Sequence, residues 1–362
     1  MAEEAETTDI TVSCGSHSPL EEDELHSFSV NLDLNQPDMC ILSVKNDGHE
    51  FSNSTKQGDA VEVKVKVGDG SDTVIFKGEV VGVEPFYKPG GKSKCTIRAF
   101  NRLHRLTRGR FSKTFLKATD QKMAGDMAKA AGLKVDSGSD PSITHEHVYQ
   151  HNQTNLEFLL LRARRIGFDV WCEDKTLFFK ETDKKKDSGI ELKLEDPEAG
   201  FLLTSFHPRI SSAGQVSKVV VRGWNPEDKE EIVGEAEAKA LGMGSETGND
   251  AAKPFGGGVT TYEVDHPVFS VDEAKAVAQG RLHELQMNYI TADAAVVGKP
   301  ELKPGVVVKV TVNTEDSSDQ FNGMYMISGA THRYTHSDGG KSRKPGGYTT
   351  HLRLKRSESG GS

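Results

Sequence analysis

The sequence has little cysteine, with four residues in 362 at positions 14, 40, 95 and 172. None of them stands in a C-x-x-C spacing, so a zinc site built from these thiols alone is not expected. Widely spaced reduced thiols are typical of proteins made in a cytoplasm rather than of disulfide-stapled secreted domains. The cysteines therefore indicate no metal and a cytoplasmic origin.

Long hydrophobic runs are also missing. The chain opens with MAEEAETTDI, which lacks the basic start and apolar core of a secretory signal. No apolar run approaches the roughly 20 residues that a membrane-spanning helix needs. We expect a soluble protein made in a cytoplasm, with no membrane partner.

An excess of positive charge is absent as well. The chain has 45 Lys and Arg against 54 Asp and Glu, a formal net charge of −9. General binding to nucleic acid or to an anionic membrane needs a positive field, so direct nucleic-acid binding is not expected. The local exception is the basic run 101–117, for which contact with an acidic neighbouring protein is the favoured interpretation.

No catalytic or cofactor-binding constellation stands out. Two GGKS stretches, 90–93 and 339–342, lack the earlier glycine of a phosphate-binding loop, since Phe86 and Thr335 occupy that position. His145 and His147 alternate with Glu146, which faces the other way along a strand, so exposed polar strand residues are favoured over metal ligands. The same interpretation is applied to His332 and His336. The sequence thus predicts no enzyme, no cofactor and no metal.

Period-two alternation dominates the first hundred residues. It runs without a break through 27–34 and 61–67, and a Gly/Asp-rich turn at 67–73 leads into further strand-like segments. Such alternation is typical of antiparallel strands with one buried face and one wet face. Several short strands with regular turns predict a small closed barrel or sandwich as the first domain, over residues 9–105.

The middle of the chain changes to helical periodicity. Thr154 and Glu157 are spaced as a capping box, and leucines at helical spacing follow until Gly167 ends the pattern. A second helix is expected near 120–131 and an aromatic hairpin over 168–179. These features predict a small α/β insert domain over residues 106–190.

The last part returns to strands. Residues 191–356 are predicted to form a second β-barrel with one helix, which starts at a second capping box, Ser270 to Glu273. The Gly-rich stretch near 241–258 is expected to be a mobile loop and 357–362 a flexible tail. The predicted fold class is β-rich α+β, with two antiparallel β-barrel domains framing a small α/β domain.

Several ordered motifs resemble those of one known family. They are Q-x-x-x-T-N-L-E-F-L (150–159), R-x-x-G-F (164–168), VRGWNP (221–226), HPVFSVDEA (266–274), GKPELKPG (298–305), FNGMY (321–325) and GGYTTHLRLKR (346–356). The chain resembles the late-control D-type proteins, which are central baseplate hub proteins of contractile phage tails and injection systems, akin to the hub part of type VI spike proteins. Asn155 stands where the family more often has Asp. The motif residues singled out are Gln150, Thr154, Asn155, Glu157, Phe158, Gly167, Ser270, Glu273, Gly323, Tyr325, Gly347 and Tyr348.

The resemblance implies a structural, homotrimeric hub with two tube-like β-barrel domains per subunit. Such a hub joins a trimeric spike below to a hexameric inner tube above. The spike is expected to be a separate polypeptide, and baseplate wedge or sheath-associated proteins are further partners. The protein would be a component of a phage tail or injection particle, and the kind of particle is left open. Two alternatives stay open: a tip-associated cell-wall hydrolase, and a hub that also docks an effector through 241–258.

Overall fold

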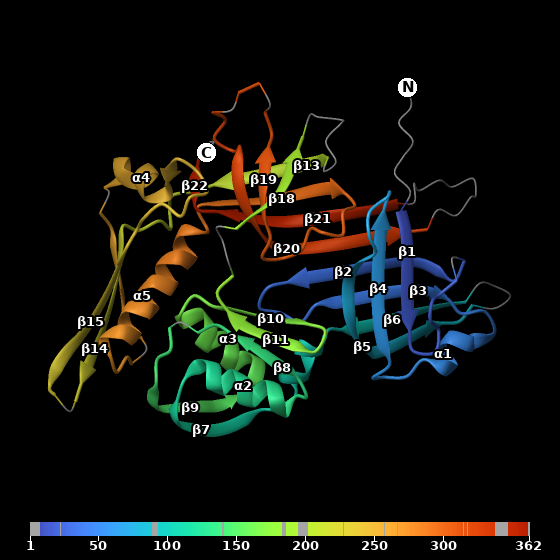
Figure 1. Cartoon of the computed structure of the whole chain (residues 1–362), viewed down its shortest axis with the longest axis horizontal. Coiled ribbons are helices and arrows are strands. Elements are labelled where there is room, and N and C mark those ends of the chain that lie inside the picture. Colours follow the sequence, from blue (N-terminus) through green and yellow to red (C-terminus); the bar gives the residue numbers. More distant parts are fainter. Residues whose placement is uncertain are drawn as a thin grey trace.

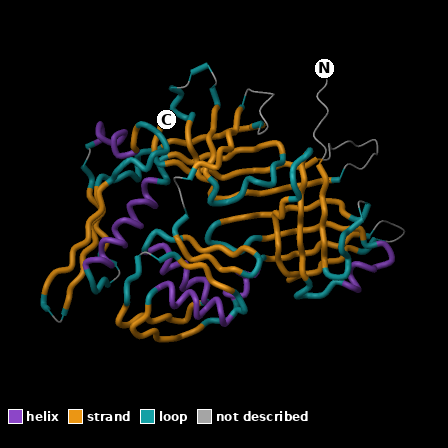
Figure 2. Tube along the Cα trace, in the orientation of Figure 1, coloured by secondary structure: helices purple, strands orange, loops and turns teal. Residues whose placement is uncertain are grey.

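A computed structural model gives the structure of the protein for residues 8–21, 23–88, 93–139, 141–182, 186–194, 202–226, 228–256, 258–265, 267–313, 315–316, 318–336 and 347–360. Figure 1 shows a broad sheet region, an α/β unit below it and a projecting hairpin beside one long helix. Figure 2 shows that strands dominate and that most of the helix lies in the α/β unit and beside the hairpin. The β-rich α+β class predicted from the sequence is confirmed.

The main sheet contains strands from both ends of the chain. They are β1 (Thr8–Cys14), β2 (Leu25–Asp33), β3 (Met39–Lys45), β4 (Ala60–Val67), β5 (Thr73–Phe86), β6 (Lys94–Phe100), β12 (Asp187–Lys193), β13 (Leu203–Ile210), β18 (Ile290–Val297), β19 (Val307–Thr311), β20 (Gly323–Thr335) and β21 (Gly347–Arg356). Their order is β1-β4-β5-β6-β3-β2-β20-β21-β18-β13, with β19 pairing both β20 and β12. A short turn of helix, η1 (Asp47–His49) and α1 (Glu50–Ser54), follows β3.

The two predicted β regions form one continuous sheet. β2 pairs antiparallel with β20, from Ser27 opposite Thr335 to Asp33 opposite Gly329. Each region keeps its own apolar core, in which the alternating valines of β4 and the inner side chains of β21 are buried. The strand pairings of the described residues form an open path, so closure into two barrels stays a prediction.

The insert contains the two helices and the aromatic hairpin expected from the sequence. Its elements are η2 (Arg102–Thr107), β7 (Phe111–Ala118), α2 (Asp120–Ala130), β8 (Lys134–Ser137), β9 (His145–Gln153), α3 (Asn155–Arg165), β10 (Asp169–Glu173) and β11 (Thr176–Lys180). β10, β11 and β8 make one small sheet, and β7 pairs with β9 in another. Both helices bury their apolar stripes in a core of their own because that stripe repeats at helical spacing.

A further unit is inserted in the sequence between β13 and β18, two strands that pair with each other in the main sheet. It contains β14 (Lys218–Asn225), β15 (Glu230–Glu237), β17 (Thr260–Glu263) and α5 (Val271–Gln286), with a separate core. An added Cβ at Gly234 in β15 would lie 2.2 Å from the backbone of Ala274, so α5 packs directly on this sheet. Sequence alternation shows that a strand has a buried face but does not show which sheet contains it. The sequence therefore predicts these strands as part of the second barrel, whereas they form a separate three-stranded sheet.

The C-terminal segment is held in place. β22 (Glu358–Ser359) pairs with β16 (Glu246–Thr247), and α4 (Gly248–Ala252) and η3 (Lys253–Phe255) follow β16. Ser357, Glu358 and Ser359 are buried. The flexible tail predicted at 357–362 is therefore wrong for residues 357–360, while 361 and 362 lie outside the described residues. The Gly-rich stretch near 241–258, predicted to be a mobile loop, contains β16, α4 and η3.

No helix in the described part of the chain is long and apolar enough to span a membrane.

Candidate functional site

The start of α3 is organised by a network of polar side chains. Thr154 Oγ1 accepts a hydrogen bond from the Glu157 amide at 3.1 Å, and Glu157 Oε2 accepts one from the Thr154 amide at 2.9 Å. The predicted capping box is thus confirmed. Gln150 is fully buried and its Nε2 donates to Gln153 O at 3.0 Å and to Asn155 Oδ1 at 3.2 Å. Asn155 therefore serves as an acceptor, a role that an Asp at this position would also fill.

The rest of α3 is fixed by packing. The ring of Phe158 stacks on Phe115 with centroids 5.6 Å apart, inside the insert core. Gly167 has φ of 73°, as its predicted place after the helix end requires. A Cβ at Gly167 would lie 3.1 Å from Gly280 Cα, so the end of α3 contacts the middle of α5 through two glycines.

The second predicted cap is only partly formed. Ser270 Oγ accepts from the Glu273 amide at 3.1 Å, as expected for the start of α5. The Glu273 carboxylate, however, accepts from the Phe269 amide at 3.0 Å and lies 3.1 Å from Arg165 Nη2 and 3.5 Å from His145 Nδ1. The interpretation that capping alone accounts for Glu273 is wrong, because the carboxylate is buried in an ionic cluster.

We call this group the junction cluster: Asp120, His145, Arg162, Arg165 and Glu273. Arg162 Nε donates to Asp120 Oδ1 at 2.5 Å, and His145 Nε2 lies 3.2 Å from Asp120 Oδ2 and 2.8 Å from Arg162 Nη2. Burial opposes ionisation of Asp120, but hydrogen bonds from His145 and Arg162 outweigh it and hold the pKa of this carboxyl below its usual range. His145 is buried, so its assignment as an exposed strand residue is wrong, whereas His147 is exposed.

The junction cluster joins elements of two units, with α2, β9 and α3 on one side and α5 on the other. A hollow of ≈ 290 Å³ opens beside it, with Tyr149, Leu161 and Phe269 among the residues that line it. These lining residues include no serine, threonine or cysteine. Since the carboxylates of the cluster already face arginines, the arrangement holds the two units together and presents no nucleophile of those three kinds.

A second buried cation lies near the C-terminus. Arg356 is fully buried, and its guanidinium donates to the carbonyl oxygens of Met243 at 3.0 Å, Asn322 at 2.9 Å and Gly360 at 2.5 Å. It also lies over the ring of Tyr325, 5.1 Å from the centroid. A Cβ at Gly323 would lie 2.2 Å from Arg356 Nη2. Two of the family motif residues therefore contact this arginine: Gly323 leaves room for its guanidinium, and the ring of Tyr325 packs against it.

Sequence reasoning missed Arg356, although a signal for it exists. In β21 every second residue from Tyr348 onward is buried, and Arg356 continues that inward series. A charged residue that alternates with the buried apolar residues of a strand is itself expected to be buried and to need polar partners.

Tyr348 belongs to a third buried polar group. Its hydroxyl lies 2.7 Å from His332 Nδ1, and His332 Nε2 lies 3.0 Å from Leu302 O. Burial lowers the pKa of His332 to about 4, so the ring is neutral at pH 7. The interpretation of His332 as an exposed strand residue is wrong. Gly347 starts β21 with no atom within 4 Å of an added Cβ, so the structure shows no packing role for it.

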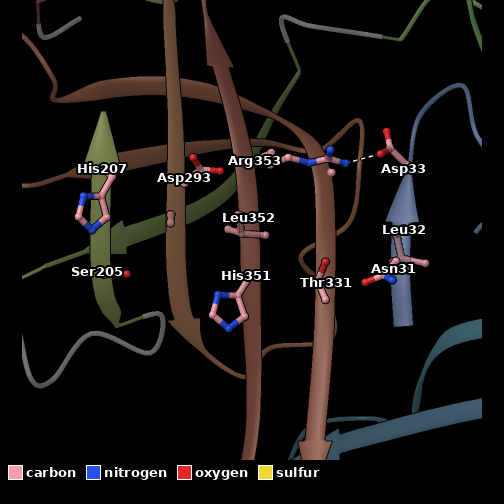
Figure 3. A pocket seen from close by; sticks show the side chains of 12 residues that line it. Asn31, Leu32, Asp33, Ser205, His207, Asp293, Thr331, His351, Leu352 and Arg353 are labelled. Atoms are coloured by element: carbon pink, nitrogen blue, oxygen red, sulfur yellow. Dashed lines mark hydrogen bonds and ion pairs between the residues drawn. The ribbon is translucent and has the colours of Figure 1, made fainter. Parts of the chain in front are cut away.

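The outward side of the main sheet carries ordered polar rows. Asp33, Gly329, Arg353, Asp293 and His207 lie opposite one another on β2, β20, β21, β18 and β13. The next row contains Asn31, Thr331, His351, Ala295 and Ser205. We call these two rows the polar sheet face, and a hollow of ≈ 470 Å³ lies over it (Figure 3).

One ion pair crosses this face between the two β regions. Arg353 extends from β21 over β20 to Asp33 on β2, as Figure 3 shows. A Cβ at Gly329 would lie 2.2 Å from Arg353 Nη2, so only glycine leaves room for the arginine to pass. No single strand could reveal this pair because it depends on which strands are neighbours.

The comparisons with known proteins agree with this architecture. The family model described as the Alg8 N-terminal domain matches residues 9–336. No curated protein matches the chain. The prophage MuSo2 tail protein of Shewanella oneidensis has a similar structure, with a TM-score of 0.65, 16% identity and coverage of 97% of this chain and 98% of that one. A tail protein from Neisseria meningitidis MC58 is similar with a TM-score of 0.68, 13% identity and 96% coverage of both chains.

A third similar structure is a type VI secretion component of E. coli, described as structurally similar to bacteriophage T4 tail proteins. Its TM-score is 0.58 at 12% identity, over 96% of this chain and 76% of that one. At these identities the likeness shows the fold, and it confirms the resemblance to baseplate hub-like proteins at that level. On the family model, which spans most of its length, the chain belongs to the Alg8 N-terminal domain family.

Proposed function

We propose that this protein is a structural baseplate hub subunit of a contractile injection particle or phage tail. The observation that carries the proposal is the extent of the fold match, since nearly all of this chain aligns with nearly all of two tail proteins. A match of that extent covers the whole arrangement of units rather than one widely shared domain. The polypeptide would join a trimeric spike to a hexameric inner tube.

In this proposal three copies form the hub, and each contributes two tube-like β regions, so that six similar surfaces meet the tube. The spike is a separate polypeptide below, and wedge or sheath-associated proteins contact the outside. The continuous sheet through β2 and β20 supports this geometry because it holds the two β regions of one subunit in a fixed relation. Assembly takes place in the bacterial cytoplasm.

We further propose that the role is structural and not enzymatic. The similar structures reported above are tail proteins and a secretion-system component, and the buried charged groups of the junction cluster are already paired. Nothing in the described residues favours the cell-wall hydrolase.

The effector-docking alternative treats residues 241–258 as a loop that could be deleted without loss of assembly. Met243 O accepts from Arg356, and the amides of Leu241 and Met243 donate to Glu358. Deleting the loop would therefore remove the partners of two buried charged side chains and is no clean test of cargo binding.

The mass of the purified protein, alone and with its cognate spike, tests the proposal. We expect a particle of three times the 39.5 kDa chain that co-elutes with the spike on size-exclusion chromatography with light scattering. A chain that stays monomeric over the accessible concentration range and ignores the spike would overturn the hub. Cryo-electron microscopy of the parent particle is the direct check, and density for this chain away from the spike–tube junction would also contradict the proposal.

A further inference from the structure

The first β region contacts the insert through the turn that joins β2 to β3. Figure 1 shows this turn, residues 34–38, beside β10. Asn35 has φ of 70°, a conformation that asparagine adopts more readily than most residues. Asn35 Oδ1 accepts from the Val170 amide at 2.8 Å, the Asn35 amide donates to Val170 O at 2.9 Å, and Asn35 Nδ2 donates to Asp169 Oδ1 at 2.9 Å. The turn is thus bonded to the insert by both its backbone and its side chain.

Asp38 forms the other half of this contact, at the place where the chain leaves the first β region. Asn101 directly follows β6 and caps η2, and its amide donates to Asp38 O at 2.9 Å. Asn101 Nδ2 donates to Asp38 Oδ2 at 2.7 Å and to Cys172 O at 3.1 Å, so it links the turn to β10. We call the turn 34–38, Asn101 and residues 169–174 of the insert the turn joint.

The carboxylate of Asp38 has hydrogen-bond donors but no counter-charge. The Asp33 amide donates to Oδ1 at 3.1 Å, and Asn101 supplies the bond to Oδ2. No lysine or arginine of the described residues forms an ion pair with Asp38, whereas the carboxylates of Asp33 and Glu173 repel it. A negative charge is costly at this position, and burial, together with that repulsion, raises the pKa of Asp38 to about 7.

Other ionisable residues surround Asp38. A hollow of ≈ 260 Å³ opens beside the turn joint, with Asp38 in its wall. The hollow and the elements packed around it carry Asp33 on β2, Lys77 on β5, Arg102 and His104 on η2, Cys172, Glu173 and Asp174 on β10, and Lys303 before β19. Several of these have charged partners of their own: Asp33 pairs with Arg353, Lys77 with Glu62, and Arg102 with Glu79 and Asp174.

Two of these neighbours need separate consideration near neutral pH. Burial raises the pKa of the Cys172 thiol to about 12, so the thiol keeps its proton there. His104 Nδ1 lies 2.8 Å from Asn101 O, so this imidazole is next to the joint and needs a control of its own.

We propose that the turn joint is a proton-sensitive contact, in which protonated Asp38 holds the first β region and the insert together and ionised Asp38 loosens them. The ionised carboxylate is better accommodated in water than beside Asp33 and Glu173, so its charge favours the open joint. The chain still passes from β6 through Asn101 into η2, so an open joint lets the insert move without unfolding it. The joint lies within one chain, so its behaviour does not rest on the proposed hub.

The direction of the pH dependence follows from the proton that the closed joint retains. The closed joint binds this proton with a pKa of about 7, and the open joint, in which the carboxyl is in water, with a pKa of about 4. The stability that protonated Asp38 gives the joint is complete below about pH 4, decreases as the pH rises to 7 and is gone above it. The equilibrium constant for opening therefore rises about tenfold between pH 6 and pH 8.

Trp171 is a local reporter of the joint. It lies on β10, lines the hollow beside Asp38 and is one of two tryptophans in the chain. Trp224, the other, is exposed on β14 in a different unit, so Trp224→Phe leaves the joint untouched. In that background the emission of Trp171 should change with a midpoint near pH 7, and Asp38→Asn should abolish this transition.

Hydrogen–deuterium exchange gives a second readout. The Val170 amide is bonded to Asn35, so its exchange reports opening of the joint directly. After correction for the intrinsic effect of pH on amide exchange, protection of residues 169–173 should fall about tenfold from pH 6 to pH 8 in the wild-type protein. In Asp38→Asn the corrected protection should not change over this range.

Two further variants keep the test decisive if Asp38→Asn folds poorly. Glu173→Gln removes a repelling charge but keeps an acceptor for Trp171 Nε1, which lies 3.2 Å from Glu173 Oε1, and it should move the midpoint to lower pH. His104→Gln removes the imidazole next to Asn101 and should leave the midpoint unchanged.

A wild-type transition near pH 7 that is lost in Asp38→Asn and moves to lower pH in Glu173→Gln supports the joint. A wild-type protein without the transition, a transition that survives Asp38→Asn or does not move in Glu173→Gln, or one that is lost in His104→Gln overturns it. All of these outcomes leave the hub standing, because they concern the inside of a single chain.

Discussion

Protonation of a fully buried histidine lowers the stability of the folded state. His332 is fully buried in β20, where Nε2 donates to Leu302 O and Nδ1 accepts from the Tyr348 hydroxyl. This arrangement uses one proton on the ring, so a second proton would remove an acceptor and introduce an unpaired buried charge. Burial accordingly lowers the pKa of His332 from 6.5 to about 4.

This lowered pKa predicts a specific acid sensitivity. The pKa is lower in the folded protein than in the unfolded chain, so protonation favours unfolding: the stability from neutral His332 is complete above pH 6.5 and is lost as the pH falls toward 4. At pH 4 the loss is about 3 kcal/mol. The free energy of unfolding, measured with urea, should therefore fall by about 3 kcal/mol less between pH 7 and pH 4 in His332→Gln than in the wild-type protein.

The exposed His147→Gln is the matched control, since it removes a histidine of the same chain without touching the buried group. Equal acid sensitivity in His332→Gln and His147→Gln would contradict the role assigned to His332.

At the scale of the elements, the backbones of α3 and α5 approach more closely than any residue larger than glycine would allow. A Cβ at Gly280 would lie 2.6 Å from Gly167 N and 3.0 Å from Arg165 O. Glycine inside a helix costs about 1 kcal/mol relative to alanine. Its presence in α5 is therefore explained by the contact with the end of α3, which a longer side chain would push away.

Gly280→Ala should destabilise the protein by about 1–3 kcal/mol despite the better helix propensity of alanine, because the added methyl meets backbone atoms that cannot rotate away. Gly167→Val should have a larger effect and impair folding or assembly, since a β-branched residue resists φ of 73°. Thermal unfolding measures both changes.

Gly214→Ala provides the control, because nothing lies within 4 Å of an added Cβ there. If Gly280→Ala raises the melting temperature instead, the two helices are not in the contact described.

At the scale of the whole molecule, the units are joined by a small number of polar contacts between distant parts of the chain. The junction cluster joins the insert to α5, Arg353 joins the two β regions through Asp33, and Arg356 holds residues near 243, 322 and 360 together. Glu273 and Arg356 are buried, and buried charged groups are costly unless each has its partner. We therefore expect removal of one partner to loosen two units at once.

Glu273→Gln should lower the free energy of unfolding by about 3 kcal/mol, because it leaves Arg165 partly buried without its carboxylate. Hydrogen–deuterium exchange should rise in both α3 and α5, which belong to different units.

Glu157→Gln is the matched control, since this exposed glutamate acts within the insert, in the cap of α3 and in an exposed ion pair with Arg110. Its loss should cost about 1 kcal/mol or less. Faster exchange confined to α5 in Glu273→Gln would show that the junction cluster does not couple the units.

The sequence alone determined the features that depend on near neighbours. The capping box of α3 joins Thr154 to Glu157, three residues away, and the alternation of β4 and the glycine after α3 are equally local. Local geometry decides such hydrogen bonds and backbone conformations whatever lies farther along the chain. The helices of the insert and the β-rich class could be predicted for this reason.

Only the tertiary structure decided which strands are neighbours and which charged residues are buried. Arg165 and Glu273 are 108 positions apart, and Arg353 and Asp33 are 320 positions apart. A periodic strand shows that one face is wet, but the partner across the sheet determines whether a polar side chain there meets water or a counter-charge. Burial is a property of the folded chain as a whole, so no local pattern contains the contacts that decide what a buried polar residue does. This holds for His145, Glu273, His332 and Arg356.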